Sequence, residues 1–162
     1  MTETTQRPPT SCDRLYDTAR QAACRLTIGV PSLHRLINTG LIPVRSLNGR
    51  RIIAKLVVGQ LLASAYEIWP PELRPQYSVK ELRRLSGITV EEVAAQLGLG
   101  RTAGYQAVRN HQIPARKLPN SARWVLPEDV VAQMEAYDLA NFAPLFEDGS
   151  PSPAPYCETE AR

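Results

Sequence analysis

Residues 18–47 read TARQAACRLTIGVPSLHRLINTGLIPVRSL, and residues 89–118 read TVEEVAAQLGLGRTAGYQAVRNHQIPARKL. At a constant offset of 71 residues, the two stretches align without a gap. The shared positions include Ala23 with Ala94, Leu26 with Leu97, Gly29 with Gly100, Ile42 and Pro43 with Ile113 and Pro114, Arg45 with Arg116, and Leu47 with Leu118. The chain therefore contains one unit twice.

The repeat continues beyond these stretches with a shift of register. The segment LNGR at 47–50 corresponds to LPNSAR at 118–123, which has two more residues in a predicted turn. The offset between the copies therefore becomes 73 residues. The segment VVGQL at 57–61 then matches VVAQM at 130–134. Repeats of about 20 to 50 residues often form solenoids, which need about three or more units for stability. Two copies of domain-like size favour two tandem domains instead.

Positive charge is concentrated in the first copy. Residues 18–63 hold seven Lys or Arg and no acid, residues 89–135 hold five bases and five acids, and residues 136–162 hold one base and five acids. A surface rich in Lys and Arg suits a polyanion, because each cation laid on a phosphate releases condensed counterions. A plain solvated surface is the alternative explanation of such an excess.

Cysteine usage and hydropathy restrict the compartment. Cys12, Cys24 and Cys157 are odd in number and widely spaced, which favours neither a disulfide framework nor a zinc site. No apolar run approaches the roughly 18 residues of a membrane span, and the polar start MTETTQRPPTS does not read as a signal peptide. These features fit the reduced cytoplasm, and no membrane partner is expected.

Apolar spacing and turn residues predict the elements of the first copy. Apolar residues recur at helical spacing in three runs, each of which ends at Gly or Pro residues. A two-residue turn at Asn48 and Gly49 is the strongest short hairpin signal, so a strand is expected on each side of it. The predicted helices are 14–26, 31–38 and 55–69, and the predicted strands are 44–47 and 50–53.

The second copy predicts the same order of elements. Its helices are expected at 89–98, at 101–110 and from Pro127 onward, and its hairpin strands at 115–118 and 123–126. Between the copies, Ser78 and Glu81 form a capping-box start for a short helix within 77–87. The predicted domains are 14–69 and 89–145, joined by a stiff linker at 70–88, with a mobile start at 1–13 and a disordered acidic tail at 146–162.

The second copy resembles a known family. The segment VAAQLGL at 93–99 leads into RTAGY at 101–105, followed by IPARK at 113–117 and RWVLPEDV at 123–130. These segments are similar to the winged helix-turn-helix of the phage excisionase and MerR-like group. The first copy is more divergent, because Thr27 stands where the family has Gly and Pro31 stands where the family usually has Arg or Ser. The resemblance implies a mainly α fold with small β-hairpin wings, arranged as tandem winged helix-turn-helix domains.

The resemblance also implies which residues contact DNA. In such proteins the second helix reads bases in the major groove, where Arg pairs with guanine and Gln or Asn pairs with adenine. Wing cations contact phosphate or the minor groove and supply affinity. The implied base-reading residues are Ser32, Arg35, Asn38, Arg101, Thr102, Tyr105, Gln106 and Arg109, and the implied wing residues are Arg45, Arg50, Arg51, Arg116, Lys117 and Arg123.

Structural roles compete with these functional ones. His34 aligns with Tyr105, and both are candidates for half-buried supports under the wing. Trp124 is expected to be a core residue that anchors the hairpin to the last helix. Arg20 and Arg25, on the first helix, are either solvated charges or phosphate contacts.

The sequence also allows another helix-turn-helix frame and other classes of function. Residues 79–97 could themselves form a helix-turn-helix, but that frame would aim Glu91 and Glu92 at the duplex, where like charges repel. Two histidines, scattered cysteines and the lack of HExxH, GxSxG or phosphate-loop motifs argue against an enzyme, and neither a cofactor nor a metal is expected. A winged protein-interaction module in a phage or plasmid assembly complex is the alternative function.

The sequence thus predicts a sequence-specific protein that binds double-stranded DNA. The resemblance favours an excisionase or a transcription regulator of a phage or mobile element, with an integrase or further copies of itself as partners. It also implies a bacterial cytoplasmic, nucleoid-associated protein. Two units in one chain have the same polarity, so we expect an asymmetric or direct-repeat site. The charge distribution predicts that the first copy supplies affinity and that the second reads the sequence.

Overall fold

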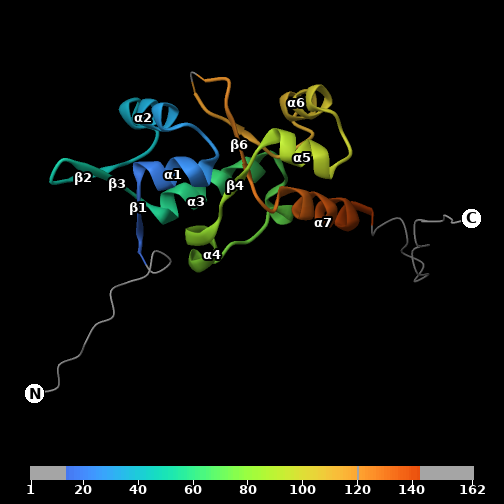
Figure 1. Cartoon of the computed structure of the whole chain (residues 1–162). Coiled ribbons are helices and arrows are strands. Elements are labelled where there is room, and N and C mark those ends of the chain that lie inside the picture. The colour runs from blue at the N-terminus through green and yellow to red at the C-terminus, as the bar shows by residue number, and fades with distance from the viewer. Residues whose placement is uncertain (1–13, 120, 143–162) are drawn as a thin grey trace, which may run out of the picture.

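The computed structural model describes residues 14–119 and 121–142; the predicted mobile start and acidic tail lie outside these ranges. The fold is mainly helical, with small antiparallel three-stranded sheets (Figure 1). In chain order the elements are β1 (Tyr16–Thr18), α1 (Ala19–Leu26), α2 (Val30–Asn38), β2 (Arg45–Leu47), β3 (Arg50–Ala54), α3 (Lys55–Ala63), η1 (Ser64–Ile68), η2 (Pro71–Leu73), α4 (Val79–Arg84), β4 (Gly87–Ile88), α5 (Val90–Gln96), α6 (Arg101–Arg109), β5 (Arg116–Lys117), β6 (Trp124–Pro127) and α7 (Val130–Phe142).

One order of elements occurs twice. The first unit is β1-α1-α2-β2-β3-α3, and the second unit is β4-α5-α6-β5-β6-α7. In each unit the first strand pairs antiparallel with the third, which gives the sheet orders β1-β3-β2 and β4-β6-β5. The repeat seen in the sequence therefore corresponds to a repeat of elements, and the predicted hairpins are each part of a three-stranded sheet.

Equivalent helix ends adopt the same unusual backbone conformation in both units. After the first helix, Thr27 has a φ of 57° and Gly98 a φ of 73°, and after the second helix Gly40 has a φ of 82° and His111 a φ of 59°. Each pair is separated by 71 positions and contains one glycine, the residue that adopts left-handed φ without steric cost. The backbone turns thus repeat even where the residue type does not.

Two predicted helix starts are wrong, and strand pairing explains both. The helix predicted from Arg14 begins only at Ala19, because residues 16–18 pair with β3 as β1. Thr18 then caps α1, with its side chain accepting from the amide of Gln21. The helix predicted from Pro127 begins at Val130, because Pro127 is the last residue of β6 and pairs with Gly87.

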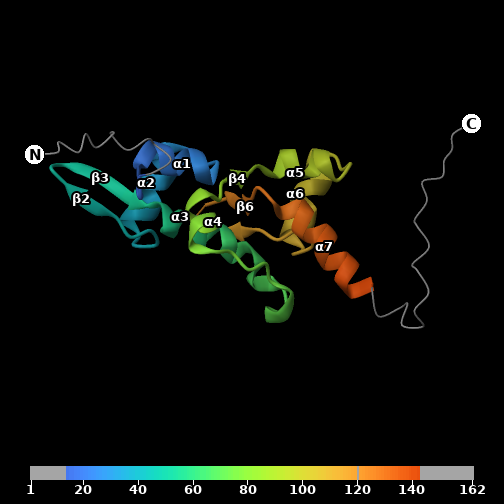
Figure 2. The ribbon, with the colours of Figure 1, turned by 90° about the horizontal axis from the view of Figure 1, so that it is seen from below.

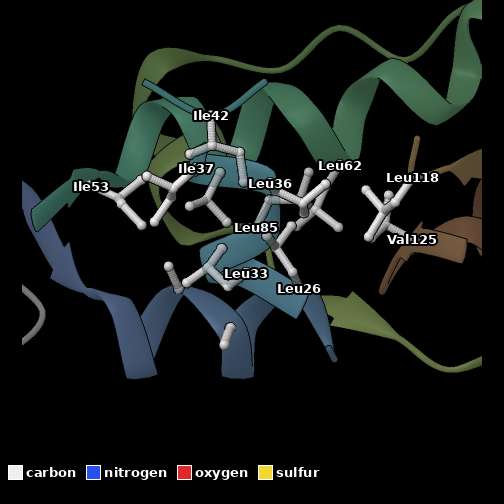
Figure 3. Packing of buried hydrophobic residues seen from close by; sticks show 13 residues of the cluster. Leu26, Leu33, Leu36, Ile37, Ile42, Ile53, Leu62, Leu85, Leu118 and Val125 are labelled. Carbon is white, nitrogen blue, oxygen red and sulfur yellow. The ribbon is translucent and has the colours of Figure 1, made fainter. Parts of the chain in front are cut away.

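The first of two apolar clusters joins both units. It combines side chains of α1, α2, β3 and α3 with Leu85, which follows α4, and with Leu118 and Val125 from the second hairpin. Figure 3 shows Leu118 and Val125 beside Leu62 of α3, at one end of the cluster. The second hairpin therefore packs against the first unit as well as its own.

The second cluster is also built from both parts of the chain. Tyr66 and Trp69, which follow α3, lie among residues of α5, α6, β6 and α7. The Trp69 ring stacks on Tyr137 of α7 with a centroid distance of 4.5 Å, and it lies 5.0 Å from the ring of Tyr66. The predicted boundary at 69/70 therefore cuts through a shared core.

The second half of the segment predicted as a linker packs against the first unit. A Cβ placed on Gly59 of α3 would overlap the carbonyl oxygen of Leu82, so α3 and α4 cross with their backbones in contact. Arg25 donates to the carbonyl of Leu85 at 2.6 Å, and Gly87 and Ile88 form β4. Since that strand separates α4 from α5, the alternative helix-turn-helix frame over 79–97 is not present.

A carboxylate joins the second unit to the segment between the units through two tyrosine side chains. Tyr66 Oη donates to Asp129 Oδ1 at 2.9 Å, and Tyr77 Oη donates to Asp129 Oδ2 at 2.6 Å. Burial raises the pKa of both tyrosines, and the neighbouring Asp129 carboxylate raises them further. These bonds join η1, the segment before α4 and the start of α7.

Within the described residues, none of the helices is long and apolar enough to cross a membrane.

Candidate nucleic-acid interface

The second helices of both units, α2 and α6, lie along one edge of the molecule. Figure 1 shows them at the top of the view, with the hairpin that contains β6 rising between them. Figure 2, seen from below, shows the first unit on one side of the molecule and the second unit on the other. The shared clusters fix this arrangement, because each contains side chains from both units or from the segment between them.

On α2, the polar face is exposed and the apolar face is buried. Leu33, Leu36 and Ile37 face the core, whereas Arg35 and Asn38 are exposed and Ser32 is half-buried. The predicted positions therefore share the outer face of a helix whose apolar stripe holds it in place. Pro31 lies in the first turn, where its missing amide hydrogen has no intrahelical partner to lose.

Arg51 connects the first hairpin to α2. Its Nη1 lies 3.5 Å from His34 Nδ1 and donates to Asn38 Oδ1 at 3.4 Å. His34 is half-buried, in agreement with a supporting position under the hairpin. Arg51 thus combines with α2 into one polar surface, whereas the sequence predicted it as a wing residue alone.

Two further cations flank the tip of the first hairpin. Arg45 and Arg50 are exposed, and the turn between β2 and β3 is formed by Asn48 and Gly49 with φ of 51° and 76°. Left-handed φ at both central residues matches the type I′ turn, whose twist suits a tight hairpin. Leu47 at the same tip is 53% exposed.

On α6, the polar face is organised by a carboxylate from the preceding helix. Tyr105 Oη donates to Glu91 Oε1 at 2.7 Å, and Arg101 Nε lies 3.5 Å from the same oxygen. The Arg101 guanidinium also lies 5.9 Å from the centroid of the Tyr105 ring. The bond from Tyr105 lowers the pKa of Glu91 and raises the pKa of Tyr105. Both predicted base readers therefore contact Glu91.

The rest of the polar face of α6 remains open. Thr102, Gln106 and Arg109 are exposed, while Ala107 and Val108 face the core. Arg101, Thr102, Tyr105 and Arg109 together line a shallow depression of about 340 Å³. A Cβ on Gly104 would lie 2.6 Å from the Cβ of Ala94, so the crossing of α5 and α6 depends on the absence of a side chain there.

In the second hairpin, Arg116 forms an ion pair that the sequence did not predict. Its Nη1 donates to Glu67 Oε2 at 3.2 Å, which turns this cation toward η1, the turn that follows the first unit. Lys117 is exposed and lies 6.0 Å from the centroid of the Trp124 ring, and Arg123 is exposed. Trp124 is half-buried at the edge of the second cluster, so it is less enclosed than predicted.

A buried acid just before residues 18–63 partly neutralises the positive charge of the first unit. Asp17, only 3% exposed, pairs with Arg25 at 2.8 Å and lies 4.0 Å from Lys55. Arg25 is therefore a structural residue, which settles the open choice between a solvated charge and a phosphate contact. Arg20, by contrast, is exposed on α1.

Sequence reasoning missed the acids that pair with these cations. Glu91 aligns with Arg20 at the offset of 71, so one equivalent position is acidic in the second unit and basic in the first. That reversal was readable from the alignment. The pairing of Arg116 with Glu67 spans 49 positions and carries no local signal.

The described part of the chain contains no group of three or more His, Cys, Asp or Glu residues placed to hold a metal ion. Comparison with family models, curated proteins and solved structures found no match to this chain.

Proposed function

We propose that this chain is a sequence-specific double-stranded DNA-binding protein made of two winged helix-turn-helix units. In each unit, α1 with α2 or α5 with α6 is the helix-turn-helix, and the β2–β3 or β5–β6 hairpin is the wing. The observation that carries the proposal is that α2 and α6 lie along one edge of the molecule (Figure 1) and that each helix has an exposed polar face. A helix of this kind fits the major groove of B-DNA.

The two units contribute differently to DNA binding. The first unit presents Arg45, Arg50 and Arg51 on its wing, all exposed, which favours contacts with phosphates, and it presents Arg35 on α2 as a base reader. The second unit presents Thr102, Gln106 and Arg109 on α6, and Glu91 positions its neighbouring Arg101. Side chains that can pair with base edges favour base reading, whereas clustered cations favour affinity.

The site is asymmetric or a direct repeat, because both units belong to one chain with one polarity. The shared cores and the Tyr66–Asp129 and Tyr77–Asp129 bonds fix the spacing of α2 and α6. A regulator of recombination or transcription in a phage or mobile element, acting on DNA alone or beside an integrase, suits such a binder.

Selection of bound duplexes from a random pool tests the proposal. We expect an enriched motif with two unlike halves, occupied by one chain as measured by the mass of the complex. A palindrome occupied by two chains would contradict the predicted symmetry of the site. A pool without enrichment would contradict sequence-specific binding.

An interaction module for proteins is the second candidate, and one observation favours it. Glu91 places a carboxylate within the polar face of α6, which reduces the attraction of that face to DNA. If this is its role, substitution of Arg101 and Arg109 by Ala leaves duplex affinity and its salt dependence unchanged. If the two residues contact DNA, the substitution lowers the affinity and makes its salt dependence shallower.

A further inference from the structure

A basic cleft lies away from the edge that carries α2 and α6. It has a volume of about 560 Å³ and is bounded by β1, α1, the start of α3 and α4. Figure 1 shows α4 on the lower edge of the molecule, whereas α2 and α6 are at the top. A straight duplex docked on the upper edge does not explain the charges gathered here.

The cleft contains six cationic side chains and one carboxylate. The carboxylate is Asp17, which pairs with Arg25 and also lies 4.0 Å from Lys55. Arg25 is further occupied by the carbonyl of Leu85. These groups form a wall whose charges are largely balanced within the protein.

Four cations at the rim are not balanced in this way. Arg14, Lys80, Arg83 and Arg84 are exposed, and none of them forms an ion pair within 14–119 and 121–142. Residues three and four positions apart share a helix face, so the three cations of α4 stand side by side. Like charges at this spacing repel one another, and a bound anion would relieve that repulsion.

The second unit shows that the fold does not require these charges. Asp17, Arg25 and Lys55 align with Ile88, Gln96 and Glu128, and Arg14 aligns with the core residue Leu85. The cleft is therefore a feature of the first unit together with α4, and it is not part of the repeated architecture.

We propose that this cleft is a phosphate-binding site, distinct from the DNA-facing edge formed by α2 and α6. Its ligand carries at least two negative charges, since four rim cations surround it. Its volume falls within the range of roughly 300 to 1,000 Å³ that is usual for small-ligand sites. The phosphate belongs either to a free polyphosphate or nucleotide, or to the backbone of a DNA segment outside the upper edge.

Thermal unfolding of the full chain with inorganic tripolyphosphate, at constant ionic strength, tests the site. A ligand that binds only the folded state raises the unfolding midpoint with concentration. We expect such a rise for the wild type. In the variant K80Q/R83Q/R84Q the dissociation constant should weaken by about tenfold or more, because each charge-assisted hydrogen bond to phosphate contributes strongly.

A variant with the same net charge separates a site from general attraction. R35Q/R45Q/R50Q removes three exposed cations from α2 and its hairpin, and it should retain the response to tripolyphosphate. Alkylation of Cys24, which lines the cleft, is a local second readout by peptide mass spectrometry. We expect tripolyphosphate to slow this reaction in the wild type and in the control, but not in the α4 variant.

Duplex binding of the same variants identifies the source of the phosphate. If the α4 variant binds duplex with a shallower salt dependence than the wild type, the cleft holds DNA backbone; if the dependence is unchanged, it holds a free phosphate compound. The proposal is overturned if the α4 variant matches the wild type in both the tripolyphosphate and duplex measurements, or if both variants lose the tripolyphosphate response equally. Failure of the control variant to weaken duplex binding would contradict the proposed function and leave the cleft unaffected.

Discussion

At the scale of single residues, Thr27 adopts a backbone conformation that glycine would adopt more readily. Its φ of 57° lies in the left-handed region of backbone conformation, as does the φ of 73° at the equivalent Gly98. Both turns are closed by the same amide-to-carbonyl bond, from Ile28 to Ala23 and from Leu99 to Ala94. A non-glycine residue in this region costs about 1 to 2 kcal/mol.

Replacing Thr27 by Gly should therefore stabilise the chain. We expect a gain of about 0.5 to 1 kcal/mol in the free energy of unfolding, since the relief of strain exceeds the entropy cost of glycine. Gly98→Thr is the reciprocal control and should lose about 1 to 2 kcal/mol. Urea denaturation measures both values. A destabilised Thr27→Gly variant would show that its side-chain bond to the carbonyl of Leu26 outweighs the strain.

Glu91 places a negative charge on the polar face of α6. Glu91→Gln removes a negative charge beside Arg101 and Tyr105, so duplex affinity should rise by a few fold, and most at low salt. Fluorescence anisotropy across a salt series measures this change. The pKa of Tyr105 should move back toward its ordinary value, because the bond from Tyr105 to Glu91 is the main cause of its rise. An unchanged affinity would place this face away from the DNA.

At the scale of elements, most helices and both hairpins were predictable, and the additional strands were not. Apolar spacing marks α2 and α6, and Asn48-Gly49 marks the first hairpin, because these are local signals. By contrast, β1 and β4 contain three and two residues and become strands only through pairing with β3 and β6. No periodicity can reveal so short a strand.

The contact between α3 and α4 is the element-level feature most sensitive to a single methyl group. Gly59→Ala would force its Cβ into the backbone of Leu82, so we expect a loss of about 3 kcal/mol or more. Gly100→Ser is the matched control, since nothing lies within 4 Å of its added Cβ and its φ is −72°. That variant should be neutral or more stable, because Ser is a preferred N-cap residue. Equal urea midpoints for the two variants would contradict the close crossing.

At the scale of the whole molecule, the two units share their cores, and this property was hidden from the sequence. Leu118 and Val125 contribute to the cluster of the first unit, while Tyr66 and Trp69 contribute to that of the second. The alignment showed which residues are equivalent, but contacts between units lie outside any repeat. For the same reason, the pairing of Arg116 with Glu67 was not predictable, whereas the acid at position 91 could be read from the alignment.

Shared cores predict that the two units unfold together, and Asp129 is the place to test it. Asp129→Ala leaves the buried Tyr66 hydroxyl without its acceptor, which should cost about 2 kcal/mol and affect the whole chain. Urea unfolding followed by tryptophan fluorescence and by circular dichroism should give coincident transitions. Separate transitions for the two probes would show that the units fold independently.

The same contact predicts how stability depends on pH. The folded state raises the pKa of Tyr66 and Tyr77 above the ordinary value of 10.0, chiefly by burial. A raised pKa in the folded state contributes stability that is complete below pH 10 and is lost as the pH rises above it. We expect the free energy of unfolding to fall above about pH 10, and to fall less steeply in Tyr66→Phe. The same slope in the wild type and in Tyr66→Phe would contradict this coupling.

The central claim is that α2 and α6 read two halves of one duplex site. Its most direct test is the affinity of the wild type, Arg35→Ala and Arg109→Ala for a selected duplex and for duplexes with base changes in either half. We predict that Arg35→Ala loses discrimination in one half only and Arg109→Ala in the other, with a loss of about 1 to 3 kcal/mol for each base contact. Variants that keep full discrimination in both halves would contradict the claim.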